Sequence, residues 1–338
     1  MISIFQGDAL TLLKLCPEKS VHCCVTSPPY FGLRDYGVAG QIGLEPTPDD
    51  FVAKLVDVFR EVRRVLRDDG TLWLNLGDSY SPGARKTQIA PTLRSATKDA
   101  ASGKQAYLNN FAVRPKGDPW SKPKDLLGIP WRVAFALQAD GWYLRQDIIW
   151  HKPNPMPESV RDRCTKAHEY IFLLSKSERY YFDAAAIAEP VAASTIERLS
   201  QPALADQAGS DRVPGKTNGP MKAKPPRFGG NKYGDDTSES SRRYSGNDYE
   251  VAGNGRRNKR SVWTVTTKPF KEAHFATFPP DLIEPCILAG CPSGGTVLDP
   301  FGGAGTTGLV AERNGRNSVL LELNAQYVEI ARKRLGLP

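Results

Sequence analysis

Residues 296–308 read Thr-Val-Leu-Asp-Pro-Phe-Gly-Gly-Ala-Gly-Thr-Thr-Gly, a short strand that runs into a glycine-rich turn. The chain is then predicted to continue as a helix from Leu309 to Asn314 and as a second strand from Ser318 to Leu321. Gly303 to Gly308 match the pattern G-x-G-x-x-G, and Glu322 follows 19 residues after Gly303, close to the place of a ribose-binding acid. Glycines let the backbone approach a ligand, and a helix N-terminus favours an anionic group. The stretch therefore predicts a site for a nucleoside cofactor, rather than a glycine loop without a ligand.

The position of this stretch in the chain decides the fold. Only about 16 residues follow Glu322, enough for the single amphipathic helix predicted over residues 325–335. The other strands of the sheet must therefore come from the N-terminal part of the chain. Strands and helices alternate there, with strands at 2–6, 21–25 and 71–76 and helices at 9–15 and from the Thr47 cap to Gly70. We expect a permuted, Rossmann-like α/β fold, with a mixed sheet and helices on both of its faces.

A carboxylate stands at the end of the strand that precedes the glycines. Asp299 suits the ammonium group of an amino-acid moiety better than it suits a pyrophosphate. S-adenosylmethionine (AdoMet) carries such a moiety and NAD does not, so the sequence favours AdoMet as the cofactor. An NAD-dependent oxidoreductase is the alternative that the glycine pattern alone would indicate.

A second informative stretch, Thr26-Ser27-Pro28-Pro29-Tyr30, follows the strand at 21–25. Two prolines can continue neither a sheet ladder nor a helix, so the chain leaves the sheet in a stiff, extended turn. The turn carries one hydroxyl group, backbone carbonyls with few competing N–H groups, and one aromatic ring. Such a platform can hold a flat group that bears an NH2, because its oxygens accept the hydrogens and its ring stacks on the plane. The alternative is an ordinary proline turn with a half-buried tyrosine.

The composition excludes several classes of protein. The 338 residues are 40% apolar and 24% charged, as in a globular protein, and neither a membrane span nor a secretion signal is recognisable. The six cysteines form no Cys-x-x-Cys pair and the four histidines are scattered, so we expect no metal site, and free thiols in a reducing cytoplasm. The net charge of +8 suits a polyanionic partner.

Two polar segments interrupt the predicted elements. Residues 81–122 are rich in Gly, Ser, Lys and Pro and are expected to form a long mobile loop. Residues 190–260 contain few large apolar side chains, and from Val191 to Arg260 there are 13 Lys and Arg against 8 Asp and Glu. This segment is either a solvated linker or an insert that contacts nucleic acid and orders on binding. Between the two segments we expect a helix at 125–139 and strands at 143–150 and 168–175, the last one antiparallel to its neighbour.

The two motifs together resemble those of the amino-group DNA methyltransferases, which methylate N4 of cytosine or N6 of adenine. Their order, with the catalytic motif first and the AdoMet motif last, is similar to the β class of that family. Residues 274–280, His-Phe-Ala-Thr-Phe-Pro-Pro, resemble the segment that helps to enclose AdoMet, and Gly7-Asp8 resembles the family's strand-end acid that contacts adenine. The resemblance implies a catalytic half at 1–183, a target-recognition insert at 190–260 and an AdoMet-binding half at 261–338.

The resemblance also implies the site residues and the reaction. An exocyclic amine of a flipped-out base attacks the sulfonium methyl of AdoMet, while the Ser27 hydroxyl and the Pro28 carbonyl accept the amine hydrogens and Tyr30 stacks on the base. The implied catalytic residues are Ser27, Pro28, Pro29 and Tyr30, and the implied cofactor-binding residues are Asp8, Thr26, Thr277, Phe278, Asp299, Pro300, Phe301, Gly303, Gly305, Thr306, Thr307 and Glu322.

The identity of the methylated base depends on the first residue of the platform. In this family Ser-Pro-Pro-Tyr usually accompanies cytosine N4 methylation, and Asp- or Asn-Pro-Pro-Tyr adenine N6 methylation. We therefore expect cytosine N4, with adenine N6 as the alternative, in double-stranded DNA of a bacterial cytoplasm. A phage-encoded enzyme would act in the same place. The resemblance leaves open whether the protein forms a homodimer and whether a restriction endonuclease accompanies it. Methylation of protein or RNA and a non-catalytic DNA-binding module are further alternatives.

Overall fold

The computed structural model describes residues 1–81, 122–192, 256–267 and 278–338. The chain divides into two compact units, one made of Met1–Asp183 with Ser261–Pro338 and the other of Ala184–Arg260. The long loop expected near 81–122, most of the basic insert, and Thr277 lie outside the described residues. Among the described helices, none is long and apolar enough to cross a lipid bilayer.

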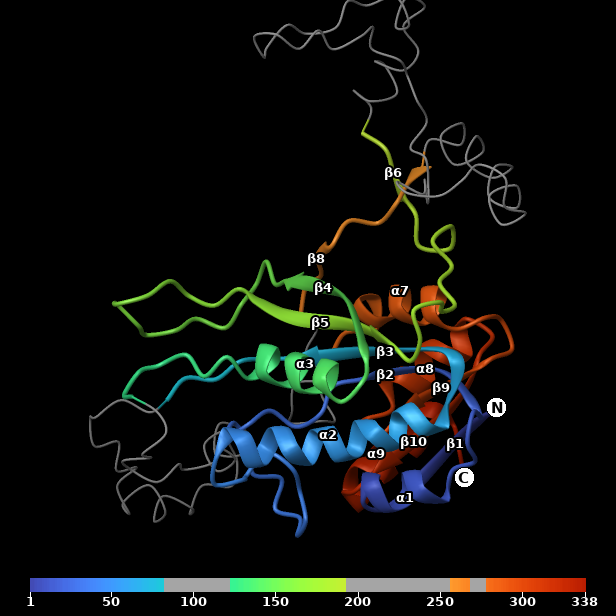
Figure 1. Cartoon of the computed structure of the whole chain (residues 1–338), viewed down its shortest axis with the longest axis horizontal. Coiled ribbons are helices and arrows are strands. Elements are labelled where there is room, and N and C mark those ends of the chain that lie inside the picture. The colour runs from blue at the N-terminus through green and yellow to red at the C-terminus, as the bar shows by residue number, and fades with distance from the viewer. Residues whose placement is uncertain (82–121, 193–255, 268–277) are drawn as a thin grey trace, which may run out of the picture. The chain divides into compact units, whose positions relative to one another are not determined.

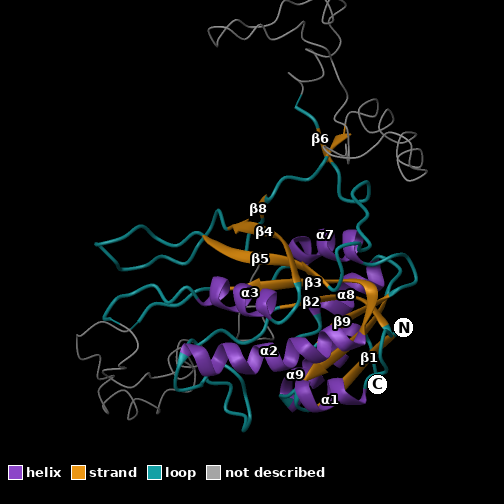
Figure 2. Ribbon diagram, viewed as in Figure 1, coloured by secondary structure: helices purple, strands orange, loops and turns teal. Residues whose placement is uncertain are grey.

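An eight-stranded sheet forms the centre of the larger unit (Figures 1 and 2). Its strands are β1 (Ile2–Gln6), β2 (Val21–Thr26), β3 (Leu66–Leu76), β4 (Tyr143–His151), β5 (His168–Ser175), β8 (Val262–Thr264), β9 (Thr296–Asp299) and β10 (Asn317–Glu322). Across the sheet they follow the order β1-β10-β9-β2-β3-β5-β4-β8. The strands from β1 to β3 in this order are parallel, β5 is antiparallel to both β3 and β4, and β8 is parallel to β4. The predicted permuted, mixed sheet is confirmed, including the antiparallel strand that begins at His168.

Helices cover both faces of this sheet. They are α1 (Ala9–Leu15), α2 (Pro48–Val65), α3 (Ile129–Ala139), α7 (Pro280–Gly290), α8 (Thr306–Arg313) and α9 (Ala325–Leu335). Helices α1 and α3 pack against α2, and α7 and α9 pack against α8 (Figure 2). Side chains alternate along β3, so Leu72 and Leu74 join the core that contains α2. Trp73 points to the other face, where a Cβ on Gly290 of α7 would lie only 2.6 Å from its Nε1.

The predicted end of α2 at Gly70 is wrong. The helix stops at Val65, and β3 begins at once with Leu66, which is buried and pairs with Val21. The chain therefore passes from helix to strand without a glycine cap. Gly70 instead saves space inside the strand, because a Cβ there would lie 3.1 Å from the carbonyl oxygen of His22.

Two other helix starts also differ from the prediction, and in both cases a left-handed glycine sets the start. Helix α3 begins at Ile129 rather than at residue 125, after Gly128 with φ +67°. Helix α8 begins at Thr306 rather than at Leu309, after Gly305 with φ +77°. The predicted bounds of α1 and α9 are confirmed. The apolar helix α7 was not expected from the sequence.

The smaller unit contains two short strands. They are β6 (Glu189–Pro190) and β7 (Arg256–Arg257), and they pair antiparallel. Arg257 Nε and Arg260 Nε both form ion pairs with Glu189 Oε1, over 3.0 and 2.6 Å. The pairing places Pro190 next to Arg256, although these two residues flank the segment 193–255 in the sequence.

Candidate active site

The carboxyl ends of β2 and β9 carry the two motifs and lie side by side. The strands are parallel neighbours, so Thr26 at the end of β2 reaches Asp299 at the end of β9. The Thr26 hydroxyl donates to Asp299 Oδ1 over 2.6 Å. The Thr307 hydroxyl donates to Oδ2 over 2.6 Å, and the Phe301 N–H donates to Oδ1 over 3.0 Å. One carboxylate thus joins the glycine loop to a platform that precedes it by more than 260 residues of chain.

Burial and hydrogen bonding act on Asp299 in opposite directions. Its side chain is almost inaccessible to solvent, and this desolvation raises the pKa of the carboxyl group. The bonds from Thr26, Thr307 and the Phe301 N–H lower the pKa in part. In the structure, Asp299 connects the two motifs by hydrogen bonds. Its contact with an ammonium group of AdoMet remains a prediction.

The glycine loop presents an open backbone surface beside the end of β10. Gly303 has φ +50°, and a Cβ there would meet no atom closer than the Phe301 oxygen, at 3.9 Å. The Gly303 N–H donates to Glu322 Oε2 and the Asn324 N–H to Oε1, each over 2.8 Å. Burial raises the pKa of Glu322, while these backbone bonds lower it. Glu322 therefore fixes the loop, and its role with a ribose remains a prediction.

The other predicted cofactor residues lie around the same sheet edge or flank the loop. The Gly7 N–H donates to the Glu322 carbonyl over 2.9 Å, which brings Asp8 to the edge where Glu322 ends β10. Asp8 is exposed, and its Oδ1 caps α1 by accepting from the Thr11 N–H over 2.8 Å. Phe278, just before α7, and Phe301 are half-buried. Pro300 and Thr306 are buried.

This arrangement fits AdoMet. The open surface over Gly303 leaves room for a ligand against the backbone, as the close approach of a nucleoside requires. Carboxylates at the ends of β1 and β10 offer acceptors for hydroxyl and amino groups. In the described ranges, no group of three or more His, Cys, Asp and Glu side chains is arranged to hold a metal ion.

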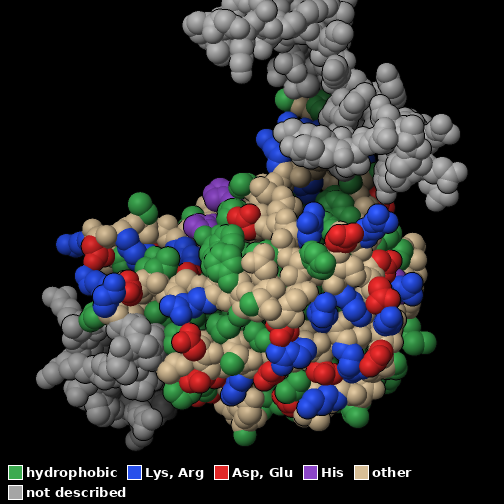
Figure 3. Space-filling model, in the orientation of Figure 1, with side chains coloured by type: hydrophobic (Ala, Val, Ile, Leu, Met, Phe, Trp, Pro, Cys, Tyr) green, Lys and Arg blue, Asp and Glu red, His purple; other side chains and the backbone are tan. Residues whose placement is uncertain are grey.

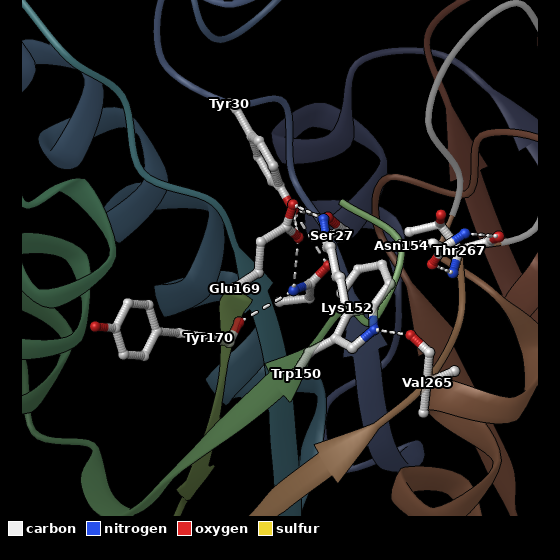
Figure 4. Close-up of polar contacts among 10 residues, drawn as sticks. Ser27, Tyr30, Trp150, Lys152, Asn154, Glu169, Tyr170, Val265 and Thr267 are labelled. Carbon is white, nitrogen blue, oxygen red and sulfur yellow. Dashed lines mark hydrogen bonds and ion pairs between the residues drawn. The ribbon is translucent and has the colours of Figure 1, made fainter. Parts of the chain in front are cut away.

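The platform follows β2, as predicted, with Pro28 buried and Pro29 half-buried. The Ser27 hydroxyl lies 3.5 Å from the Tyr30 hydroxyl. The Tyr30 hydroxyl donates to Glu169 Oε2 over 2.7 Å (Figure 4). It also lies 3.2 Å from Asn75 Oδ1. Burial, and then the Glu169 carboxylate, raise the pKa of Tyr30 well above its ordinary value. Tyr30 is therefore held by its hydroxyl group, and stacking of its ring on a base remains a prediction.

Three polar residues beside the platform were not expected from the sequence. Asn75 lies in β3, Glu169 near the start of β5, and Lys152 just after the end of β4. Glu169 forms an ion pair with Lys152, and the Asn75 amide donates to the Tyr170 carbonyl over 3.0 Å. The sequence did offer a signal for them: each is a polar residue inside or beside a run of apolar strand residues. A polar side chain in such a place is buried only if it has a hydrogen-bond or ionic partner.

The sheet order and the joined motifs define the class of the protein: a Rossmann-like methyltransferase with a permuted chain. The family model described as DNA methylase, N6_N4_Mtase, matches residues 21–333, and the chain belongs to this AdoMet-dependent family. It is 44% identical to the type II methyltransferase M.Cfr9I of Citrobacter freundii, over 98% of this chain and 87% of that protein. It is 42% identical to the type II methyltransferase M.SmaI of Serratia marcescens, over 98% of this chain and 90% of that protein.

Solved structures share the fold at lower identity. The cytosine-N4-specific PvuII DNA methyltransferase matches with a TM-score of 0.60 and 19% identity, over 98% of this chain and 86% of that chain. The protein TTHA0409 of Thermus thermophilus, complexed with S-adenosyl-L-methionine, matches with a TM-score of 0.53 and 21% identity, over 99% of this chain and 95% of that chain. These structures show the shared fold, while the family model and the type II relatives show that the chain is a DNA methyltransferase of the N6/N4 family.

Proposed function

We propose that the protein methylates the N4 amine of cytosine in double-stranded DNA. The observation that carries the proposal is Ser27, a neutral hydroxyl at the first position of the platform, next to the Thr26–Asp299 bond that ties the platform to the glycine loop. Serine at this position usually accompanies cytosine N4 methylation in the family. The fold likeness to the cytosine-N4-specific PvuII enzyme supports the same assignment.

The residues of the platform would prepare the amine. The Ser27 hydroxyl and the Pro28 carbonyl accept its two hydrogens, which favours a tetrahedral nitrogen whose lone pair points away from these acceptors. AdoMet, when bound, supplies a methyl group on a positively charged sulfur. Asp8, Phe278, Gly303 and Glu322 would line its site, and Asp299 keeps that site in register with the platform. The base leaves the duplex to reach the platform, at a cost of a few kcal/mol.

The target-recognition role is assigned to residues 190–260. On the face seen in Figure 3, Lys and Arg side chains are intermixed with Asp and Glu. Ion pairs such as Arg60–Asp140 and Arg64–Glu61, at 2.6 and 2.7 Å, neutralise charges of the larger unit. The segment from Val191 to Arg260, in contrast, has 13 basic against 8 acidic residues, so it is the natural candidate for phosphate contacts.

Nucleoside mass spectrometry tests the proposed function. Double-stranded DNA with many different sequences is incubated with the protein and AdoMet, digested, and analysed for methylated nucleosides. We expect N4-methylcytosine. N6-methyladenine as the only product would overturn the base assignment, and the absence of any methylated nucleoside would overturn the activity itself.

Replacing the platform hydroxyl tests the mechanism. Ser27→Ala should lower the methylation rate by about 100-fold, because one acceptor for the amine is lost where charge develops. AdoMet binding, measured by calorimetry, should survive in this variant and in the double variant with Tyr30→Ala, which should abolish turnover. Wild-type turnover in the double variant would remove the platform from the mechanism.

A further inference from the structure

A charged pair lies directly behind the platform and has no part in the mechanism above. Glu169 accepts the Tyr30 hydrogen bond through Oε2 and forms an ion pair with Lys152 through Oε1 (Figure 4). Their side chains are only 16% and 18% exposed. A charged pair removed from water to this extent costs free energy, so its position beside the reacting groups requires an explanation.

Hydrogen bonds hold the chain on both sides of Lys152 in the sequence. The Trp150 indole donates to the Val265 carbonyl over 2.8 Å, and the Asn154 side chain exchanges two hydrogen bonds, of 3.0 and 3.2 Å, with the backbone of Thr267. The Lys152 ammonium also lies 4.1 Å from the centre of the Trp150 ring. The ammonium is therefore held in place as a fixed counter-charge for Glu169.

The carboxylate sets the direction of the hydrogen bonds in front of it. An ionised carboxylate only accepts, and so does Asn75 Oδ1, the other acceptor near the Tyr30 hydroxyl. The Tyr30 hydroxyl therefore donates its one hydrogen on this side, and Glu169 Oε2, at 2.7 Å, is a nearer acceptor than Asn75 Oδ1, at 3.2 Å. The lone pairs of the Tyr30 oxygen are then free to accept from Ser27. Once the Ser27 hydrogen points to Tyr30, the Ser27 oxygen presents only lone pairs to a substrate. The 3.5 Å between these two hydroxyls is long, and such bonds often tighten when the substrate is bound.

We propose that Glu169 is a positioning residue that makes Ser27 a hydrogen-bond acceptor for the substrate amine. It acts through the chain Ser27–Tyr30–Glu169, and the proposal rests on the proposed function of the platform. If the Ser27 hydroxyl turned its hydrogen toward the amine, that hydrogen would repel the amine hydrogens. The Glu169 carboxylate prevents this, because it directs the Tyr30 hydrogen to itself and leaves the Tyr30 oxygen to accept the Ser27 hydrogen. The ion pair with Lys152 keeps the carboxylate in place.

The variant Glu169→Gln tests this directly. The glutamine amide has almost the same shape but can donate to Tyr30, so the chain can run in the reverse direction. We expect the single-turnover rate of methylation, at saturating DNA and AdoMet, to fall about 10- to 100-fold, with AdoMet binding unchanged. Glu158→Gln is the matched control, because Glu158 is another ion-paired carboxylate, 2.6 Å from Arg163, in the connection between β4 and β5 that also contains Lys152. It should keep the wild-type rate.

A double-mutant cycle separates positioning from a merely structural ion pair. Tyr30→Phe keeps the ring but breaks the same chain, so it should show a similar loss, and its combination with Glu169→Gln should be little slower than the slower single variant. Losses that multiply would overturn the proposal. If Glu169→Gln does not fold, Tyr30→Phe alone decides, because a wild-type rate in that variant also overturns it.

The rate of the Glu169→Gln variant separates the two proposals. An unchanged rate in this variant, with an active wild type, would contradict the positioning role alone. A wild type that methylates no DNA would instead overturn the proposed function, and this inference with it.

Discussion

Gly77, directly after β3, leaves room for the Tyr30 ring. A Cβ at this position would lie 2.4 Å from Cε2 and 2.8 Å from Cδ2 of the ring. The ring cannot simply swing aside, because its hydroxyl is bound to Glu169. Gly77→Ala should therefore displace the platform, at an overpacking cost of about 1–3 kcal/mol, and lower the methylation rate at least 10-fold. Rate measurements with AdoMet calorimetry as the folding control would check this, and a wild-type rate would contradict it.

At the level of single residues, the sequence predicted the motif residues at the strand ends better than the side chains that contact the platform. Thr26, Asp299 and Thr307 were expected near a cofactor, and the structure joins them by direct hydrogen bonds. Glu169 and Lys152 were missed. Their contact depends on which residues of β4 and β5 face each other, and no local motif contains that register.

A histidine side chain in β2 forms a hydrogen bond to β9 that requires its ring to be neutral. The Thr296 N–H donates to His22 Nδ1 over 3.1 Å, and only an unprotonated ring nitrogen can accept this bond. Burial, and then the Arg67 guanidinium, lower the pKa of His22 from its ordinary value of 6.5. The unfolded chain therefore takes up this proton first, so the stabilisation is present above about pH 6.5 and is lost as the pH falls below it.

Denaturant unfolding at pH 7.5 and pH 5 measures this contribution. The wild type should lose about 1 kcal/mol more than His22→Asn over this interval, because one backbone hydrogen bond depends on the neutral ring and asparagine does not titrate. Equal pH dependence of the free energy of unfolding in both proteins would show that His22 does not couple to folding.

At the level of elements, local signals fixed the helix caps but not every boundary. The Thr47 side chain accepts from the Asp50 N–H over 3.1 Å, as a capping threonine should. Gly70 was expected to end a helix and Gly308 to belong to the glycine-rich turn, but they lie inside a strand and a helix. Both are required by close neighbours, since a Cβ on Gly308 would lie 3.0 Å from Leu320 Cδ1. Whether a glycine is needed for close packing or for a turn depends on its neighbours in the folded molecule. A single sequence does not distinguish the two.

At the level of the whole molecule, the pairing of β6 with β7 suggests a clean way to remove the basic insert. Pro190 and Arg256 are paired, so a linker of about four residues can replace 193–255. The resulting protein should keep its unfolding midpoint and its AdoMet affinity, because the sheet and glycine loop lie in the other unit. Methylation of a specific DNA site should fall at least 100-fold if the insert reads DNA. Site-specific methylation by the shortened protein would contradict the target-recognition role, and lost AdoMet binding would place part of the cofactor site in the insert.

The pairing of β1 with β10 has a consequence for how the protein folds. At this edge of the sheet Ile2 pairs with Ser318 and Gln6 with Glu322, and the Met1 ammonium donates to Asn317 Oδ1, a residue 316 positions away in the sequence. A contact between residues so far apart stabilises the chain only after a very large loop has closed, and such contacts slow folding. We therefore expect this edge of the sheet to form late during refolding, after the contacts between α1 and α2, which are much closer in sequence.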